Sequence, residues 1–327
     1  MASAVTGTPY LSASPTNYAG TNTQLSQAIQ TIWSKEILFQ SMPVLRFEQM
    51  AVKKTELGVQ PGLVINFMRY NNLGAASQLV EGVRMQTNAL SASQYSITVA
   101  EHGYAVAVTE LLLNASFDDV MASASRLLGR NMALYLDGSA RDTILTASSV
   151  IFGYQNATTR TAISPYDHGT LAANRAALTG DFYFSPAVVK DAVETLSTKN
   201  VPRLGDTYVC FVHPHQSRRL RDAPEFIEQT KYAAPGNFML GEIGRLNDVV
   251  FIETTQVKAL AGAGGGGSTV YQSIFMGDNA FGHAISLPVE LRDGGILDFG
   301  REHALAWYAI WGFGLITDNA VCLSETN

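Results

Sequence analysis

The stretch that decides the fold is SQYSITVAEHGYAVAVT, residues 93–109, together with the sequence that follows it. Apolar residues alternate here with serine, threonine and alanine, and this two-residue period predicts a half-buried strand. From Ser116 the apolar residues recur at helical spacing, so we expect Ser116 to cap a helix that continues to about Thr146. Such a long helix usually serves as a spine, and the combination indicates an α+β fold.

On the amino-terminal side, Leu63–Tyr70 is a second strand candidate that could pair with residues 93–109 as a long hairpin. The segment between the two strands is rich in glycine, asparagine and serine and has too few apolar residues for a core. We therefore expect the hairpin to project and to need a partner. Residues 1–20 predict an extended arm, and residues 25–37 predict an amphipathic helix that Pro43 ends.

On the carboxyl-terminal side, helices and buried strands alternate and predict a small α/β unit. Ser185-Pro186 starts a helix that ends at Asn200, and the apolar run Tyr208–Val212 is strand-like. A short helix is expected after Pro214. The remaining predictions are strands at residues 249–254 and 269–275, and a long strand with Trp307, Trp311 and Phe313 on one face and Gly312 and Gly314 on the other.

Composition limits the functions that fit this chain. Of 327 residues, 46% are hydrophobic and 15% charged, which suggests that much surface is buried against other copies of the chain. The net charge of -6 argues against a strongly basic nucleic-acid binder. No Lys or Arg precedes Lys35, so no export signal is expected. As a helix, residues 304–316 would span about 20 Å, too short for a bilayer, and no membrane role is expected.

Two clusters of side chains are candidates for a metal site or an anion-binding site. His213 and His215 flank a proline, and a metal-dependent hydrolase using both stays open as an alternative, although strand-end histidines are the favoured interpretation. Arg218, Arg219 and Arg221 form the sole basic cluster, and acids including Asp222 and Glu225 follow them in the sequence. An ion-pair face is favoured over a phosphate clamp or a nucleic-acid-binding module.

No recognisable catalytic motif occurs elsewhere in the chain. The glycine run at residues 262–267 resembles a dinucleotide fingerprint only in spacing, because a strand is expected to follow it instead of a helix. Two cysteines, Cys210 and Cys322, indicate neither a disulfide framework nor a cysteine zinc site. We therefore expect no enzyme activity, no cofactor and no metal.

The order of these parts, together with a series of short motifs, carries a family resemblance. The motifs are Trp33–Glu36, Leu79–Val83, Gly103-Tyr104, Val212–Pro214, Phe226–Tyr232, Gly241–Gly244 and Val249–Glu253. In this series the chain resembles major capsid proteins of tailed bacteriophages with the HK97-like fold, and more narrowly the coat family typified by phage N4. One departure is Asn247-Asp248, where such coats tend to have a glycine turn.

The resemblance implies a division into five parts. They are an amino-terminal arm and helix (1–55), an extended hairpin loop that lies over a neighbouring subunit (56–104), a peripheral domain with the spine helix (105–180), an axial domain (181–285) and terminal strands returning to the peripheral domain (286–327).

The resemblance also implies the function. The chain would assemble into pentamers and hexamers of an icosahedral shell around viral double-stranded DNA, in the host bacterial cytoplasm, and would end in the virion. Its partners would be other copies of itself, a scaffolding protein, a portal, a decoration protein, and DNA by weak non-specific contact. A compartment shell of the same fold that packages an enzyme is the alternative. Candidate subunit-interface residues are Trp33, Glu81, Arg84, Arg218, Arg219, Arg221 and Glu225.

Overall fold

The structure is a computed structural model. The expected arm, the expected helix at residues 25–37 and Trp33 lie outside the residues that it describes. Those residues are 45–55, 63–70, 73–76, 78, 81–82, 84–85, 87–116, 119–155, 170–223, 226, 242–298 and 301–327.

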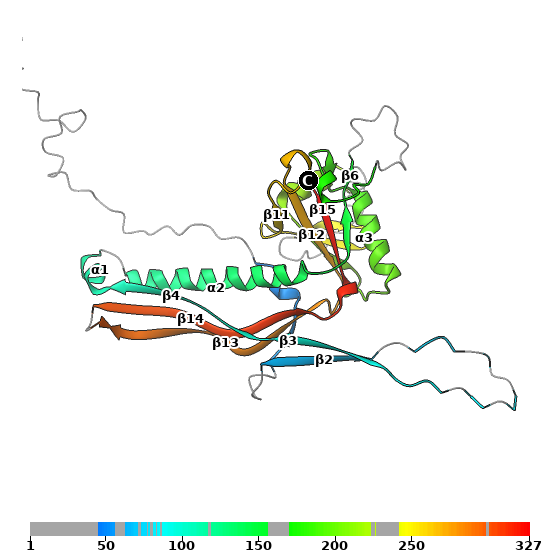
Figure 1. Cartoon of the computed structure of the whole chain (residues 1–327). Helices are drawn as coiled ribbons and strands as arrows, with labels where there is room; N and C mark the ends of the chain where they lie inside the picture. Colours follow the sequence, from blue (N-terminus) through cyan, green and yellow to red (C-terminus); the bar gives the residue numbers. More distant parts are fainter. Residues whose placement is uncertain are drawn as a thin grey trace, which may run out of the picture. The chain divides into compact units, whose positions relative to one another are not determined.

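The first of two main sheets is built around a long antiparallel pair of strands (Figure 1). Its order is β1 (Val52–Lys54), β13 (Phe281–Leu297), β14 (Glu302–Leu315) and β4 (Ala100–Thr109). β4 pairs with β14 without a register shift, whereas β13 has three irregularities against β14. The strand character predicted for residues 100–109 and for the apolar run after residue 304 is confirmed.

The predicted spine helix, α2 (Val120–Ile144), packs on one face of this first sheet (Figure 1). Leu128 of the helix lies in a buried cluster with Trp307 and Trp311 of β14. The indole Nε1 of Trp307 donates a hydrogen bond to Asn131 Oδ1 at 3.1 Å, which satisfies the polar end of a buried ring. The predicted aromatic face of β14 is therefore the face that the helix covers.

The start of the spine helix differs from the prediction. A separate short helix, α1 (Glu110–Ala115), follows β4, and Ser116 is its C-cap. α2 begins after Asp119, whose side chain accepts the N–H of Ala122 at 3.1 Å. Serine and aspartate are both good N-caps. The prediction of Ser116 was wrong because the residues before it belong to α1.

The predicted hairpin is confirmed for its inner part. β2 (Val64–Tyr70) and β3 (Ala92–Thr98) pair antiparallel in an unbroken register. The stretch 93–109 is nevertheless not one strand. It is interrupted at Val99, whose N–H donates to the carbonyl of Leu63, and the chain beyond pairs with β14.

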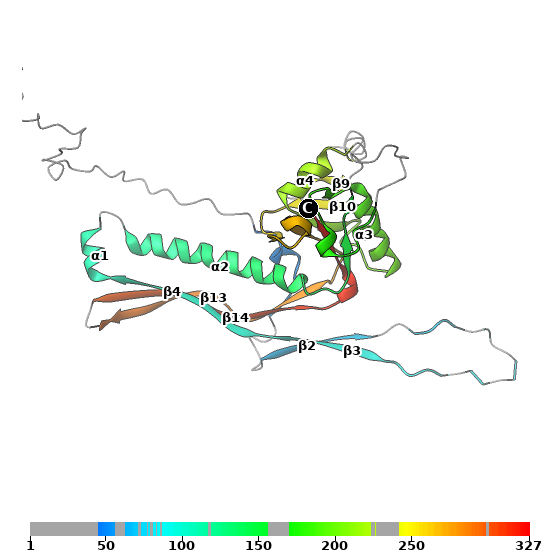
Figure 2. The ribbon, with the colours of Figure 1, turned by 45° about the horizontal axis from the view of Figure 1, so that its top comes forward.

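The second sheet has seven strands and forms the α/β unit that the sequence predicts (Figure 2). Parallel strands β8 and β10 lie at its centre with β12, and α3 (Pro186–Thr198) and α4 (Pro214–Arg221) belong to the same unit. β11 pairs with β12 at one side. The strands are β5 (Val150–Phe152), β15 (Val321–Thr326), β12 (Val270–Met276), β8 (Tyr208–Val212), β10 (Val249–Glu253), β9 (Glu242–Leu246) and β11 (Lys258–Leu260).

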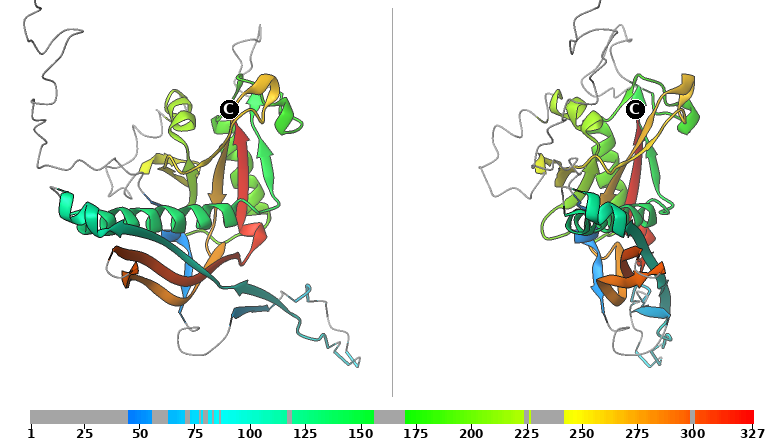
Figure 3. Two further views of the ribbon diagram at one scale, coloured as in Figure 1. Left: turned by 60° about the vertical axis from the view of Figure 1, so that its left-hand side comes forward. Right: turned by 90° about the vertical axis from the view of Figure 1, so that its left-hand side faces the viewer.

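Two of these strands come from outside residues 181–285, the range expected for the axial part. β15 pairs antiparallel with β12 and parallel with β5, and Figure 3 shows it in red within this sheet. A separate short sheet consists of β6 (Tyr154–Gln155), which follows β5 in the sequence, and β7 (Phe182–Tyr183), which pairs with it antiparallel. Glu325 of β15 is buried and accepts hydrogen bonds from Arg175 and Gln272, each at 2.8 Å, so its charge is compensated.

Asn247 and Asp248 form the turn between β9 and β10, where the coat-family pattern has a glycine turn. Asn247 and Asp248 have φ values of 48° and 63°, both in the left-handed region. Asparagine and aspartate tolerate this region better than other residues, and a two-residue turn of this kind matches the twist of a hairpin. The departure from the coat-family pattern therefore preserves the hairpin.

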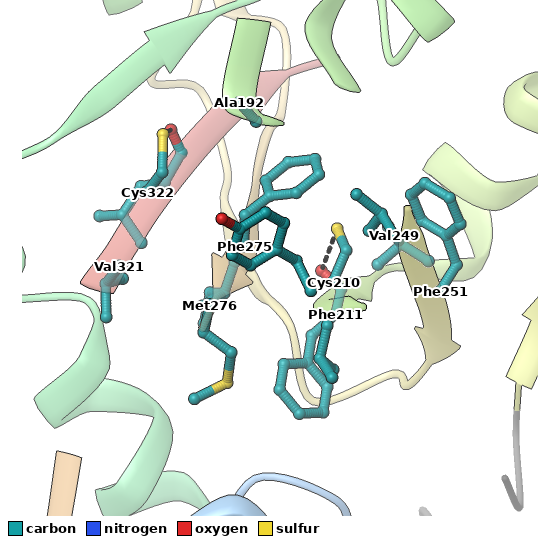
Figure 4. Packing of buried hydrophobic residues seen from close by; sticks show 14 of the residues in the cluster. Ala192, Cys210, Phe211, Val249, Phe251, Phe275, Met276, Val321 and Cys322 are labelled. Carbon is teal, nitrogen blue, oxygen red and sulfur yellow. Dashed lines mark hydrogen bonds between the residues drawn. The ribbon is translucent and has the colours of Figure 1, made fainter. Parts of the chain in front are cut away.

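The main hydrophobic core lies around the second sheet (Figure 4). Phe211, Phe251 and Phe275 are fully buried in it, as are both cysteines. The same cluster includes Ile144, at the end of α2, and Phe47, whose ring centroid lies 4.5 Å from that of Phe211. The end of the spine helix and the segment before β1 thus share one core with the second sheet.

Candidate assembly surfaces

Among the described residues, the hairpin carries more exposed large apolar side chains than any other element. Leu63 is 70% exposed and Leu90 is 72% exposed, and Met68 and Tyr70 of β2 are similar. Exposed apolar groups gathered on one element usually mark an interaction surface in a soluble protein. Among the described residues of β2 and β3, the buried apolar side chains are Ile65 and Ile97, at the root of the hairpin.

Two of the sequence-predicted interface residues lie in this hairpin. Glu81 and Arg84 are both exposed near its tip. Trp33 and Glu225 lie outside the described residues, so the structure does not bring the predicted set together as one site. No described contact links Glu81 or Arg84 to the arginine cluster of α4.

The arginine cluster lies on the exposed side of α4. Arg221 Nη2 lies 3.1 Å from Glu253 Oε2 of β10, and the guanidinium of Arg219 stacks 4.0 Å from the ring centroid of Tyr183. The described partner of Arg221 is thus Glu253. The sequence alone instead pointed to acids that follow the cluster, such as Asp222. Two of the three guanidinium groups are engaged within the chain, which favours an ion-pair face over a phosphate clamp.

The two histidines have a structural role. His213 is the N-cap of α4: its Nδ1 accepts the N–H of His215 at 3.1 Å, and Gln216 Oε1 accepts the N–H of His213 at 3.2 Å. Both imidazoles stack on Tyr271, and burial lowers the pKa of His213, which favours the neutral ring that the cap requires. Since Nδ1 is occupied as an acceptor, it is not presented to a metal ion.

The described residues offer no other chemical centre. They contain no group of three or more His, Cys, Asp or Glu side chains that could hold a metal ion. Burial raises the pKa of Cys322 to about 11 and that of Cys210 well above its usual value, so neither thiol is a reactive thiolate. None of the helices in the described ranges has both the length and the hydropathy of a membrane span.

Sequence reasoning missed the buried carboxylate of Asp137 in α2. Its Oδ1 accepts the backbone N–H groups of Arg46, Phe47 and Glu48 at 3.1, 2.8 and 3.2 Å. Burial raises the pKa of Asp137, although the three amide donors act to lower it. The only signal was an acid at the same helical spacing as the buried Ala140 and Ile144.

An ion pair also holds the same segment against the first sheet. Glu48 Oε1 lies 2.6 Å from Lys53 Nζ and 3.4 Å from Nδ1 of the buried His283, a long distance for a hydrogen bond. The interaction with His283, followed by that with Lys53, lowers the pKa of Glu48 to about 2. The residues from Arg46 to Lys53 are therefore fixed both to the spine helix and to the first sheet.

This arrangement defines a class of protein. A spine helix on a long sheet, a second sheet with its own core and a projecting hairpin with exposed apolar side chains, without a catalytic centre in the described residues, indicate a subunit of a larger shell.

Comparison with known proteins identifies the family. Residues 93–323 match the model of the phage capsid protein family, and the chain belongs to that family. No match was found among curated proteins. The family match favours a phage shell over a compartment shell and over the metal-dependent hydrolase.

Solved structures show the same fold. A capsid subunit of cyanophage Pam1 aligns with a TM-score of 0.71 at 15% identity, covering 92% of this chain and 97% of that one. The capsid of Ralstonia phage GP4 gives 0.69 at 18% identity, with coverage of 95% and 97%. The mature capsid of bacteriophage PhiM1 gives 0.68 at 14% identity, with coverage of 98% and 99%.

The fold is HK97-like, the fold of icosahedral phage capsid shells, as the sequence predicts. The protein is a major capsid protein: its role is structural and not enzymatic, it assembles with copies of itself, and its place is the virion.

Proposed function

We propose that the chain forms pentamers and hexamers of an icosahedral shell that encloses double-stranded DNA, and that the hairpin lies over a neighbouring subunit. The observation that carries this proposal is the set of exposed apolar side chains on the hairpin, with Leu63, Met68, Tyr70 and Leu90 each about two-thirds exposed or more. Burying such groups between copies gives each contact a modest stability, and many contacts in a closed shell add up.

The parts of the chain take the following roles in this proposal. Within residues 1–55, the amino-terminal arm reaches toward adjacent subunits, and residues 56–104 form the overlying hairpin loop. The spine helix and the first sheet form the peripheral domain, and the second sheet forms the axial domain that meets its copies at five-fold and six-fold axes. The proposed domain ranges remain 105–180, 181–285 and 286–327, with β15 contributing to the axial sheet.

The proposed interface residues lie in two regions of the subunit. Glu81 and Arg84 would meet the neighbour through the hairpin, and Arg218, Arg219 and Arg221 through α4 of the axial domain. Trp33 and Glu225 complete the set. Exposed ion pairs contribute little stability, so these charges would mainly select the register between subunits.

Further partners belong to the same proposal. Assembly takes place in the host bacterial cytoplasm with a scaffolding protein and a portal, and a decoration protein binds the finished surface. DNA contacts the shell weakly and without sequence preference, because a subunit with a net charge of -6 neutralises few phosphates.

Deleting residues 71–88 tests the role of the hairpin, because β2 ends at Tyr70 and β3 begins at Ala92. The expected result is a soluble folded subunit that fails to close shells, seen by electron microscopy and sedimentation of the protein expressed alone and with its neighbouring gene products. A matched variant replaces the same residues with an equal length of Gly-Ser sequence, which keeps the chain length and removes the side chains of the tip, including the exposed Leu73 and Met85. Normal shells from either variant would contradict the proposed role.

A further inference from the structure

Three glycines lie where the hairpin meets the first sheet. Gly312 and Gly314 belong to β14, and Gly282 of β13 pairs with Gly314 across the sheet. Residues alternate between the two faces of a strand, so Gly312 and Gly314 lie on the face opposite Trp307 and Trp311, and therefore opposite α2. None of the three glycines has a positive φ, so backbone conformation does not explain them.

Close approach of the hairpin explains all three glycines. Ile97 of β3 is 2% exposed, and a methyl group at Gly314 would lie 2.8 Å from its Cγ1. A methyl group at Gly282 would lie 2.9 Å from its Cδ1. At Gly312 the obstacle is backbone, since a methyl group there would lie 2.2 Å from the carbonyl oxygen of Thr98.

The glycines thus leave a depression in the sheet, which the side chain of Ile97 fills over Gly282 and Gly314 and the backbone of Thr98 fills over Gly312. Ile316 also borders the depression, because its Cδ1 would lie 3.1 Å from a methyl group at Gly282. The small buried cluster there consists of Ile65, Ile97, Val99 and Ala284. It is separate from the main core, and its members come from both hairpin strands, from the chain just after β3 and from β13. The hairpin has no other described buried apolar residue, so this cluster is its anchor to the sheet.

We propose that Gly282, Gly312 and Gly314 form a seat for Ile97, and that this seat fixes the direction in which the hairpin leaves the first sheet. The role of this seat in assembly rests on the proposed function, because the direction of the hairpin matters for assembly only if the hairpin reaches a neighbouring subunit. These glycines and Ile97 are then positioning residues: they contact no neighbour themselves and act through the hairpin.

The contacts predict a specific pattern of rescue. Gly314→Ala should displace the hairpin because Ile97 fills the space, and adding Ile97→Ala should restore the position, since the remaining Cβ of residue 97 would lie 3.6 Å from the new methyl group. Gly312→Ala should also displace it, but Ile97→Ala should not rescue that variant, because the clash is with the backbone of Thr98. Gly74→Ala, where a methyl group meets no atom within 4 Å, is the control.

The direction of the hairpin can be measured on unassembled full-length subunits. Spin labels at exposed positions, introduced by Met68→Cys in β2 and Ala122→Cys in α2, report the distance from the hairpin to the spine helix by pulsed electron resonance. Both native cysteines are buried, which confines the label to the new sites. Hydrogen exchange of β12 checks that the second sheet stays folded in each variant. Ile97→Val, which removes only Cδ1, is a milder change, and we expect it to broaden the distribution of distances.

Unlabelled versions of the same variants are then assembled and counted as closed shells by electron microscopy. We expect Gly314→Ala and Gly312→Ala each to shift the distance and to lose closed shells. The double variant Ile97→Ala/Gly314→Ala should recover the wild-type distance and the shells, whereas Ile97→Ala/Gly312→Ala should recover neither. Unchanged distances in both glycine variants would overturn the seat. Shifted distances with normal shells would support the seat and overturn the proposed role of the hairpin in assembly.

Discussion

Removing the carboxylate of Asp137 should be among the most destabilising single changes in the subunit. Asp137→Ala leaves the N–H groups of Arg46, Phe47 and Glu48 without their acceptor, and Phe47 is completely buried. An unsatisfied buried N–H costs about 1–3 kcal/mol, and the loss of a desolvated charge offsets part of that sum. We expect a net loss of about 3 kcal/mol in the free energy of unfolding.

The assay is urea unfolding of unassembled subunits, followed by circular dichroism. With a slope of about 3 kcal/mol per molar urea, the midpoint of Asp137→Ala should fall by about 1 M. Asp137→Asn keeps a carbonyl acceptor, and because burial raises the pKa of Asp137, the uncharged amide should be tolerated at a cost of about 1 kcal/mol or less.

The matched control is Asp142→Ala on the same helix. The side chain of Asp142 is half exposed and pairs with Arg141 and Lys258, so its removal should cost less than about 1 kcal/mol. If Asp137→Ala lowers the midpoint no more than Asp142→Ala does, then the three hydrogen bonds do not hold the segment before β1, and the reasoning fails.

Three further changes test local features. The pKa of Glu48 is lowered from 4.5 to about 2, chiefly by His283, so Glu48→Gln should cost about 1–2 kcal/mol above pH 4.5, and the difference from wild type should vanish in unfolding curves as the pH falls toward 2. Asp119→Ala should lower stability by about 1 kcal/mol through loss of the α2 cap, whereas Asp119→Asn should be nearly neutral; equal losses would exclude capping as the cause. Asp248→Val should cost about 1–2 kcal/mol because φ is 63° there, whereas Asp248→Gly should lie within about 0.5 kcal/mol of wild type, and thermal unfolding that ranks the two the other way would refute a strained turn.

Much of the fold could be predicted because local signals and tertiary structure agree. The apolar run Tyr208–Val212 is a fully buried strand, and Ser185-Pro186 stands at the start of α3 as expected. The arginine cluster was placed correctly on the short helix after Pro214. In each case a few neighbouring residues specify the element.

What the sequence could not supply depends on residues far apart in the chain. The break at Val99 arises because residues 100–109 pair with β14, about two hundred positions later. Arg221 pairs with Glu253 of another strand instead of with an acid close by in the sequence, and Asp137 binds amides about ninety residues earlier. Periodicity describes the face of an element and says nothing about which distant segment covers it.

The position of β15 has a consequence for how subunits are made. Residues 321–326 pair with β12 on one side and β5 on the other, so the second sheet is divided until they arrive. A chain without residues 321–326 has no strand to join β5 to β12, and its largest hydrophobic core stays open because Val321, Cys322 and Leu323 belong to that core. During synthesis, the second sheet can therefore be completed only after these residues leave the ribosome, although β5, β8, β10 and β12 are made earlier.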